Sequence, residues 1–207
     1  FELELKSGEV VELDYIIQQF IKLLQITGGF YYNPDHAPED LPCGKMDNLK
    51  WMMDQGEFRR TKKIVLGAAF NHELERIRDM AVGLGYHGVM FWKHTEDRKA
   101  TRQQFAEDPA CQLFIGQVAS GIGMNELKVA DTVFYYSRSL KVIHRMQSED
   151  RNHRKGSEIH DRIRYIDMVV PGTVDARVYS MIRKYRDVAS QIIDGKTAMA
   201  LLSSEMS

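Results

Sequence analysis

The chain has few cysteines, few prolines and no long apolar run. Its 207 residues include two cysteines and five prolines. Cys43 and Cys111 stand alone, so the sequence predicts neither a disulfide framework nor a zinc site. The longest apolar runs, such as 64–70, fall far short of the ~20 residues that span a membrane, and no charged and then apolar leader opens the chain. We therefore expect a soluble protein of a reducing, cytoplasmic setting, with no membrane partner.

What the chain does have is enough apolar material for a core, since 43% of its residues are hydrophobic and 28% are charged. This composition predicts one globular domain with an appendage, or two small ones. The formal net charge is -1, but residues 137–165 carry eight Lys or Arg and four Asp or Glu, a local +4 that leaves -5 elsewhere. Such a segment is either a solvated helix face or a surface for phosphates.

Hydrophobic periodicity predicts the N-terminal elements. Apolar residues recur at helical spacing over 14–27, and Gly28-Gly29 ends the pattern, which indicates a helix. The sequence "YYNPDHAPEDLPCG" (31–44) is rich in Pro, Asp and Gly and predicts an exposed loop. A short helix is expected at 46–55.

From residue 64 onward, short apolar runs alternate with helical stretches of ten to fifteen residues. The predicted strands are 64–70, 88–92, 112–116, 132–136 and 164–170. The predicted helices are 73–84, 96–107 and 140–153, followed by a final helix at 174–193. Nearly continuous apolar strands with helical crossovers predict an α/β fold with a mostly parallel central sheet between two helical layers. We expect the α/β lobe over 61–195, a helical segment leading into it over 1–60, and a tail over 196–207.

Ligands bind at the carboxyl ends of strands in such sheets. The loop after the third predicted strand, "QVASGIGMN" (117–125), contains Gly121 and Gly123, and small residues let a backbone approach a phosphate or sugar closely. A tight strand-to-helix turn is the alternative interpretation of this loop.

A polar stripe is predicted in "QSEDRNHRKG" (147–156). Successive helical residues are about 100° apart, so Gln147, Arg151 and Arg154 share a narrow face. A salt-bridged helix surface is the simple alternative. No phosphate-binding P-loop accompanies the stripe, because "GKT" at 195–197 lacks the required glycine, where Ser190 stands, and follows a helix rather than a strand.

Four segments together resemble a known family. They are "KIVLGAAF" (63–70), "FIGQVASGIGMNELKVADTVFYYS" (114–137), "QSEDRNHRKG" (147–156) and "GTVDARVY" (172–179). In this order they resemble motifs four to six, and the element that follows them, of the second RecA-like lobe of a superfamily-two helicase of the Swi/Snf type. The compact form is similar to phage or bacterial members. The resemblance implies a three-layer RecA-like fold and a motor whose ATP lies between two lobes.

The resemblance also implies roles at the nucleotide. By position, Arg154 would be the finger on the γ-phosphate, with Arg151 beside it, Gln147 positioning the pair and Asp150 orienting an arginine. Guanidinium groups suit this role because they are permanently charged and bind phosphoryl oxygens in a bidentate manner.

Further nucleotide contacts would come from Gly121, Gly123 and Asn125. ATP and magnesium would be held mainly by a first lobe that this chain lacks, so neither would bind tightly here and no metal ligand is expected in this chain.

Nucleic acid, by the same resemblance, would contact the same sheet edge through Lys93, His94, Thr95, Gln117 and Ser120. For Thr95 an N-cap of the following helix is an equal alternative. The implied partners are the first RecA-like lobe of the same protein and DNA, expected to be double-stranded.

By itself the chain should show no ATPase activity. Two other classes stay open at the level of sequence. One is a nucleic-acid-binding module without chemistry, and the other is a Rossmann-like domain that binds a nucleotide cofactor through Gly121 and Gly123.

Overall fold

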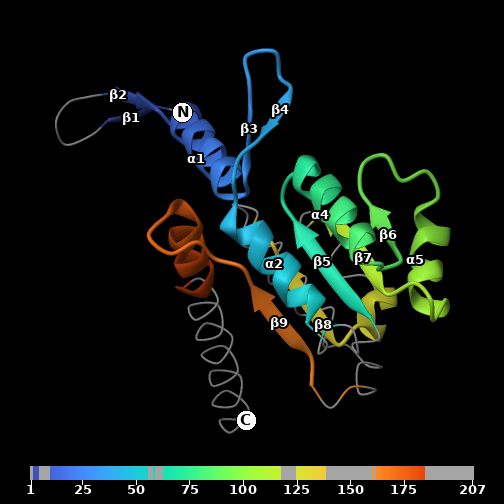
Figure 1. Ribbon diagram of the computed structural model, residues 1–207. Helices are drawn as coiled ribbons and strands as arrows, with labels where there is room; N and C mark the ends of the chain where they lie inside the picture. Colours follow the sequence, from blue (N-terminus) through green and yellow to red (C-terminus); the bar gives the residue numbers. More distant parts are fainter. Residues whose placement is uncertain are drawn as a thin grey trace, which may run out of the picture.

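A five-stranded parallel sheet forms the centre of the molecule (Figure 1). The computed structural model describes residues 2–4, 10–55, 58, 63–117, 125–138, 160 and 162–184. The strands are β5 (Ile64–Ala68), β6 (Gly88–Phe91), β7 (Leu113–Gln117), β8 (Thr132–Tyr135) and β9 (Arg164–Asp167), in the spatial order β6-β7-β5-β8-β9. Every neighbouring pair is parallel. The predicted α/β class and the five predicted strands are therefore confirmed, with ends that differ by one to three residues.

Helices α2 (Gly44–Asp54) and α4 (Asn71–Gly83) cover one face of this sheet (Figure 1). Alternate strand residues such as Ile64 and Leu66 of β5 point to them, and Leu49 of α2 and Leu74 of α4 complete this hydrophobic cluster. All four side chains are fully buried. Because side chains of a strand alternate between faces, the intervening Val65 points to the other side of the sheet, where a second cluster forms.

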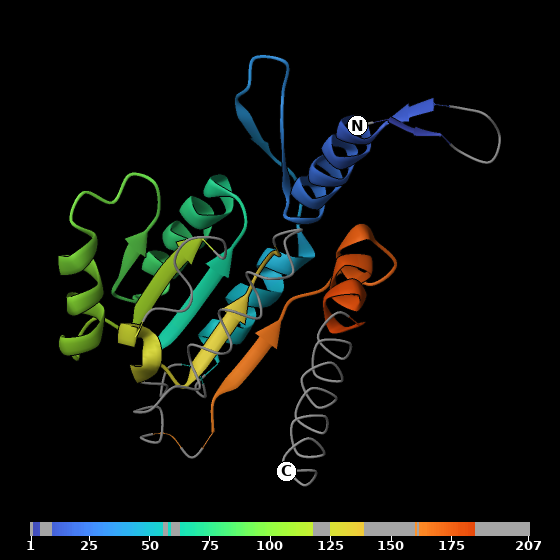
Figure 2. The same ribbon diagram turned by 180° about the vertical axis from the view of Figure 1, so that it is seen from behind.

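That second cluster lies under α5 (Arg98–Glu107) and the 3₁₀-helix η1 (Asn125–Val129). Phe105 of α5 and Leu127 of η1 pack with Phe114 of β7 and Val133 of β8. Figure 2, seen from behind, shows α5 beside the sheet and η1 at its near side. The predicted three-layer arrangement is thus present, and it explains why the strands are apolar on both faces.

The N-terminal part differs from the sequence prediction in two short antiparallel strand pairs. Helix α1 (Leu13–Thr27) is where the periodicity placed it. The stretch predicted as an exposed loop, however, contains the antiparallel hairpin of β3 (Phe30–Tyr32) and β4 (Pro38–Asp40). A second short antiparallel pair, β1 (Glu2–Glu4) and β2 (Val10–Glu12), precedes α1. Three-residue strands lie below the length at which alternation is informative, which is why the hairpins were not predicted.

The turn between α1 and β3 explains the two successive glycines. Gly29 has a φ of +89°, a conformation that side chains disfavour. A Cβ atom on Gly29 would also lie 2.4 Å from Cβ of Cys43. The chain can therefore reverse direction here and pass close to the start of α2 only with glycine at this position.

Residues 174–184 form the described part of the predicted final helix. Its Val178 and Ile182 pack against Leu24 of α1, and these three side chains form a small third cluster. In the described residues, this helix therefore packs back on the body of the protein. The helix predicted at 140–153 lies outside the described residues.

Candidate functional site

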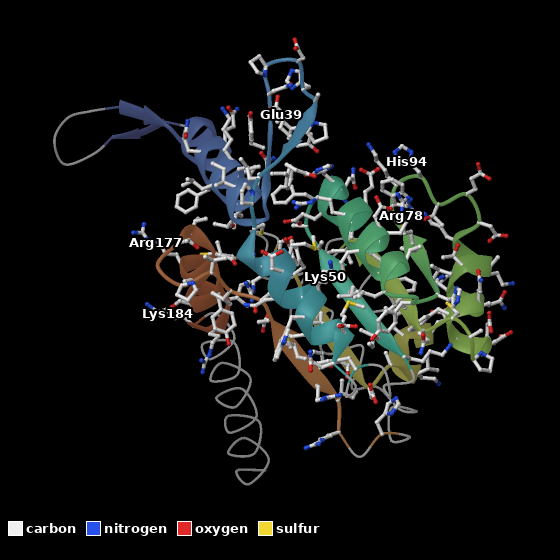
Figure 3. The ribbon with its side chains drawn as sticks, viewed as in Figure 1. Glu39, Lys50, Arg78, His94, Arg177 and Lys184 are labelled. Carbon is white, nitrogen blue, oxygen red and sulfur yellow. The ribbon has the colours of Figure 1, made fainter. Side chains whose placement is uncertain are left out.

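The candidate site is the carboxyl edge of the sheet, where all five parallel strands end. The described segments that leave β5, β6 and β8 begin at this edge because the strands run in one direction. Of the residues predicted to bind nucleic acid, Lys93, His94 and Thr95 follow β6, and Gln117 ends β7. Figure 3 shows His94 on the loop that rises beyond the end of β6. The structure thus brings two of the predicted contact segments to one edge.

The loop after β6 presents Lys93 and His94 to solvent. Neither side chain forms an ion pair in the described part of the chain, and the His94 ring lies edge-on to Trp92 at 4.8 Å. Thr95 has an internal role instead. Its Oγ1 accepts a hydrogen bond from the Trp92 N–H at 3.0 Å and donates one to the Met90 carbonyl at 3.1 Å. Thr95 therefore shapes the loop that exposes its two neighbours.

The alternative prediction that Thr95 is the N-cap of the next helix is wrong. The N-cap of α5 is Asp97, whose carboxylate accepts a hydrogen bond from the Ala100 N–H at 2.8 Å. An aspartate satisfies the free N–H groups of a first helical turn as well as threonine does. The helix begins two residues later than that prediction because Thr95 is engaged by the turn at 92–95.

Gln117 meets a residue that sequence reasoning missed. Its Nε2 donates a hydrogen bond to Oδ1 of Asn71 at 2.8 Å. Asn71 is the first residue of α4, which follows strand β5. Because β5 pairs with β7, its last residue, Ala68, lies opposite Gln117. The sequence did contain a signal for this contact, because Asn71 is a polar residue that follows the predicted strand at 64–70.

The predicted nucleotide-binding residues lie almost entirely outside the described residues. These are Gly121, Gly123, Gln147, Asp150, Arg151 and Arg154, and Ser120, which was predicted to contact nucleic acid, also lies outside them. Asn125 is described as the first residue of η1, but its side chain is not. The roles assigned to these residues stay predictions.

A buried carboxyl group closes the N-terminus of α4. Glu73 is fully buried, and its Oε2 accepts a hydrogen bond from the Phe70 N–H at 3.2 Å and another from the hydroxyl of Ser137. That hydroxyl in turn accepts the Ala69 N–H at 2.7 Å. Burial, the largest cause, raises the pKa of Glu73 to about 7, although the Ser137 hydrogen bond and Lys45 act in the opposite direction.

This carboxyl group also bears on the Rossmann-like alternative. A dinucleotide-binding domain places a pyrophosphate at the helix N-terminus after its first strand, over glycines that let the backbone approach. Here that position, after β5, holds Ala69, Phe70 and the side chain of Glu73. An acid at this place competes with a phosphate for the same N–H groups and repels it once ionised. The geometry therefore disfavours nucleotide binding of the Rossmann type.

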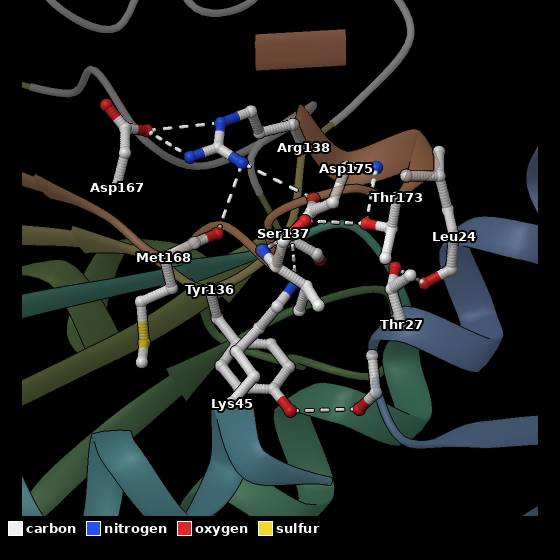
Figure 4. A network of polar contacts seen from close by, with 12 residues as sticks. Leu24, Thr27, Lys45, Tyr136, Ser137, Arg138, Asp167, Met168, Thr173 and Asp175 are labelled. Atoms are coloured by element: carbon white, nitrogen blue, oxygen red, sulfur yellow. Dashed lines mark hydrogen bonds and ion pairs between the residues drawn. The ribbon is translucent and has the colours of Figure 1, made fainter. Parts of the chain in front are cut away.

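A set of buried charged side chains joins the end of the sheet to α2 and to the C-terminal helix (Figure 4). Lys45 Nζ lies 2.7 Å from Asp175 Oδ2, and these side chains are 2% and 0% exposed. Arg138, just after β8, contacts Asp175 Oδ1 at 3.4 Å and Asp167 Oδ1 at 2.9 Å. It also donates to the Met168 carbonyl at 3.2 Å. We call Lys45, Arg138, Asp167 and Asp175 the charge cluster.

The charge cluster is balanced, since two cations face two carboxylates. Buried charges are tolerated only when they are paired and hydrogen-bonded. The Val170 N–H completes the shell by donating to Asp175 Oδ2 at 3.1 Å. The cluster therefore fixes the segments that leave β8 and β9 at the carboxyl edge, where predicted functional loops also lie.

No group of three or more His, Cys, Asp or Glu side chains is arranged to hold a metal ion in the ranges that the structure describes. Within the same ranges, no helix is both long and apolar enough to cross a bilayer.

Comparison by sequence gives no match, since no protein-family profile and no curated protein is similar to the chain. Comparison of structures does give matches. The C-terminal part of the Fun30 ATPase domain has a TM-score of 0.59 and 22% identity, over 68% of this chain and 45% of that one. The C-terminal domain of the Sulfolobus solfataricus SWI2/SNF2 ATPase has a TM-score of 0.59 and 16% identity, over 86% and 73%.

A third similar structure is the Pyrococcus furiosus Hef helicase domain. Its TM-score is 0.54 and its identity 23%, over 69% of this chain and 29% of that one. The chain thus spans less than half the length of the Fun30 and Hef structures. Together with the parallel sheet and its two helical layers, these likenesses show that the chain has a RecA-like α/β fold, which it shares with these ATPase and helicase domains.

Proposed function

We propose that this chain is the second motor lobe of an ATP-dependent DNA translocase or helicase of the Swi2/Snf2 type. The observation that carries the proposal is the likeness of its five-stranded parallel sheet to C-terminal ATPase lobes. In a two-lobed motor, ATP and magnesium bind mainly to the first lobe, which here would be the partner of this chain within the same protein.

The lobe would contribute arginine side chains to ATP hydrolysis. Arg154 would reach the γ-phosphate, Arg151 would lie beside it, and Gln147 and Asp150 would orient them. A guanidinium group stabilises the charge that develops on the transferred phosphoryl group, and such fingers typically contribute roughly 10³ to 10⁵ in rate. Support comes from the ordered sequence motif and from the fold. Gly121, Gly123 and Asn125 would approach the nucleotide from the neighbouring loop.

The nucleic-acid contacts would come from the carboxyl edge. Lys93 and His94 are exposed and lie in the loop that Thr95 holds in place, and Gln117 with Ser120 would continue this surface. Contacts of this kind to phosphates are independent of sequence and sensitive to salt, as a motor that moves along double-stranded DNA requires. The proposed setting is the cytoplasm and nucleoid of a bacterial or phage-infected cell.

ATP hydrolysis by the intact two-lobed protein tests the proposal. Arg154→Ala should lower DNA-stimulated turnover about 10³-fold or more while the affinity for ATP, measured with a fluorescent analogue, changes little. Arg78→Ala is the matched control because Arg78 lies on the exposed side of α4 and pairs only with its neighbour Asp79 and the Met90 sulfur in the described structure. That control should retain full turnover.

Two results would contradict the proposal. Turnover by the 207-residue chain alone that survives Arg154→Ala would place the chemistry elsewhere. An intact protein that binds DNA through Lys93 and His94, yet never hydrolyses ATP in the presence of its first lobe, would indicate the non-catalytic nucleic-acid-binding module instead.

A further inference from the structure

A groove of about 710 Å³ lies between α1 and the β3–β4 hairpin. In Figure 1 the hairpin projects from the body beside the end of α1. The α1 residues that line the groove are Gln18, Ile21, Lys22, Gln25 and Ile26. They share one stripe of the helix, because residues three, four and seven apart lie on the same face. The opposite stripe, with Leu24, is already covered by the C-terminal helix. The groove face of α1 is therefore a second surface with no covering element among the described residues.

Gln25 is the unusual residue of this groove. Its side chain is only 9% exposed, yet its primary amide has no hydrogen-bond partner in the described structure. Within the described residues, the amide is not among the fully enclosed side-chain atoms that lack a hydrogen bond. The remaining contact of the amide is thus with the groove that it lines. The amide therefore offers a hydrogen-bond donor and an acceptor to whatever enters the groove.

The hairpin side of the groove is largely apolar and aromatic, although the polar Asn33 and His36 also line it. Tyr31, Tyr32 and Leu41 line it from the hairpin side. Two of the six large hydrophobic side chains that are strongly exposed in the described residues line the groove, namely Ile26 at 49% and Tyr32 at 41%. Exposed apolar side chains that gather in one place indicate a binding surface, and tyrosine is enriched where proteins bind one another.

The charge beside the groove distinguishes a peptide from a nucleic acid. The hairpin contributes three carboxylates, Asp35, Glu39 and Asp40. Asp40 is neutralised by His72 at 2.7 Å and Arg76 at 3.3 Å, but Asp35 and Glu39 are exposed and have no ion pair within the described ranges. Lys22 is the one lysine or arginine among the described residues that line the groove. Two uncompensated carboxylates on the projecting hairpin repel phosphates and attract cationic side chains.

We propose that this groove binds an extended segment of another protein, with an aliphatic side chain as anchor and a lysine or arginine next to it. The aliphatic side chain would lie between Ile21 and Tyr32, and the basic residue would face Asp35 and Glu39. The amide of Gln25 would donate to a peptide carbonyl and accept from a peptide N–H, since a primary amide can do both. The proposal is independent of the motor function.

The test uses the full chain and peptides selected from a random displayed library. Selected peptides should bind with micromolar affinity and share an aliphatic residue beside Lys or Arg. Gln25→Met should weaken their binding at least tenfold in fluorescence anisotropy. The urea midpoint of unfolding should stay unchanged or rise, because an apolar side chain of similar length removes the unpaired amide. A purely structural glutamine would show the opposite, a loss of stability.

Gln55→Met is the matched control. Gln55 is an exposed glutamine at the end of α2 that donates only to the Trp51 carbonyl in the described structure, and its replacement should leave peptide binding unchanged. The proposal is overturned if no peptide is selected, or if Gln25→Met binds the peptides as wild type does. It is also overturned if a single-stranded oligonucleotide binds the groove and loses affinity in Gln25→Met, which would assign the site to nucleic acid.

Discussion

At the scale of single residues, Glu73 is the clearest case of an ionisable group whose state depends on the fold. It is fully buried beside Gly28, where a Cβ atom would lie 2.1 Å from its Oε1. Its folded pKa of about 7 compares with an ordinary value of 4.5. The carboxyl group is therefore neutral in the folded protein at mildly acidic pH, while in the unfolded chain it is already ionised.

The direction of the pH dependence follows. The stabilisation of the folded state by the protonated Glu73 is fully present below about pH 4.5. It is lost as the pH rises through about 7, because over this interval the unfolded state binds fewer protons than the folded one. The difference of roughly 2.5 pKa units corresponds to about 3 kcal/mol. The free energy of unfolding, measured by urea denaturation, should fall over this interval and level off above it.

Glu73→Gln isolates this contribution. The amide keeps the shape of the protonated carboxyl group but does not ionise, so the variant should equal wild type near pH 4 and exceed it by about 3 kcal/mol at pH 8. Equal slopes for the two proteins between pH 5 and 7 would show that Glu73 does not titrate in this way.

At the scale of elements, the C-terminal end of α5 depends on one lysine. Lys63 precedes β5, is 8% exposed and donates to the carbonyls of Phe105 at 2.5 Å, Asp108 at 2.5 Å and Cys111 at 2.8 Å. The last carbonyls of a helix have no partner within it, and a cation there also interacts favourably with the helix dipole. Lys63 thus joins the end of α5 and the following turn to the start of the central strand.

Lys63→Met should therefore lower the free energy of unfolding by about 3 kcal/mol, because three carbonyls lose their charged donor while the apolar stem is kept. Urea denaturation measures the loss. Lys99→Met on the exposed side of the same helix should change stability by about 0.5 kcal/mol or less. A similar effect of the two substitutions would contradict the capping role of Lys63.

At the scale of the whole molecule, the charge cluster holds together segments that are up to 130 positions apart in sequence. Lys45 comes from α2, Arg138 from the end of β8, and Asp175 from the C-terminal helix. Asp175 contacts both cations, so it is the common partner of the cluster. Removing one member of a buried ion pair leaves an uncompensated charge, which usually costs about 3 to 5 kcal/mol.

Asp175→Asn should accordingly lower the free energy of unfolding by about 3 kcal/mol or more, measured by urea denaturation. Asp79→Asn serves as the control, since Asp79 is 67% exposed in its pair with Arg78 and surface pairs contribute at most about 1 kcal/mol. If Asp175→Asn changed stability as little as Asp79→Asn does, the cluster would not be what holds these segments together.

The sequence by itself determined the α/β architecture of this protein. Apolar runs of strand length and helices of 3.6-residue period are local properties, so strands such as β5 and β8 and helices such as α1 could be predicted without any knowledge of contacts. Parallel order then followed from the helical crossovers. This also placed Lys93, His94 and Gln117 at one edge of the sheet before their geometry was known.

Only the tertiary structure decided which polar groups meet. The pairing of Lys45 with Asp175, of Gln117 with Asn71 and of Lys63 with the end of α5 depends on how remote segments pack. The same holds for the groove beside Gln25, because the hairpin that forms its other wall consists of strands too short to show a period. Periodicity reports which face of an element is buried. It carries no information about the partner that covers that face, and this partner decides the state of every buried charge.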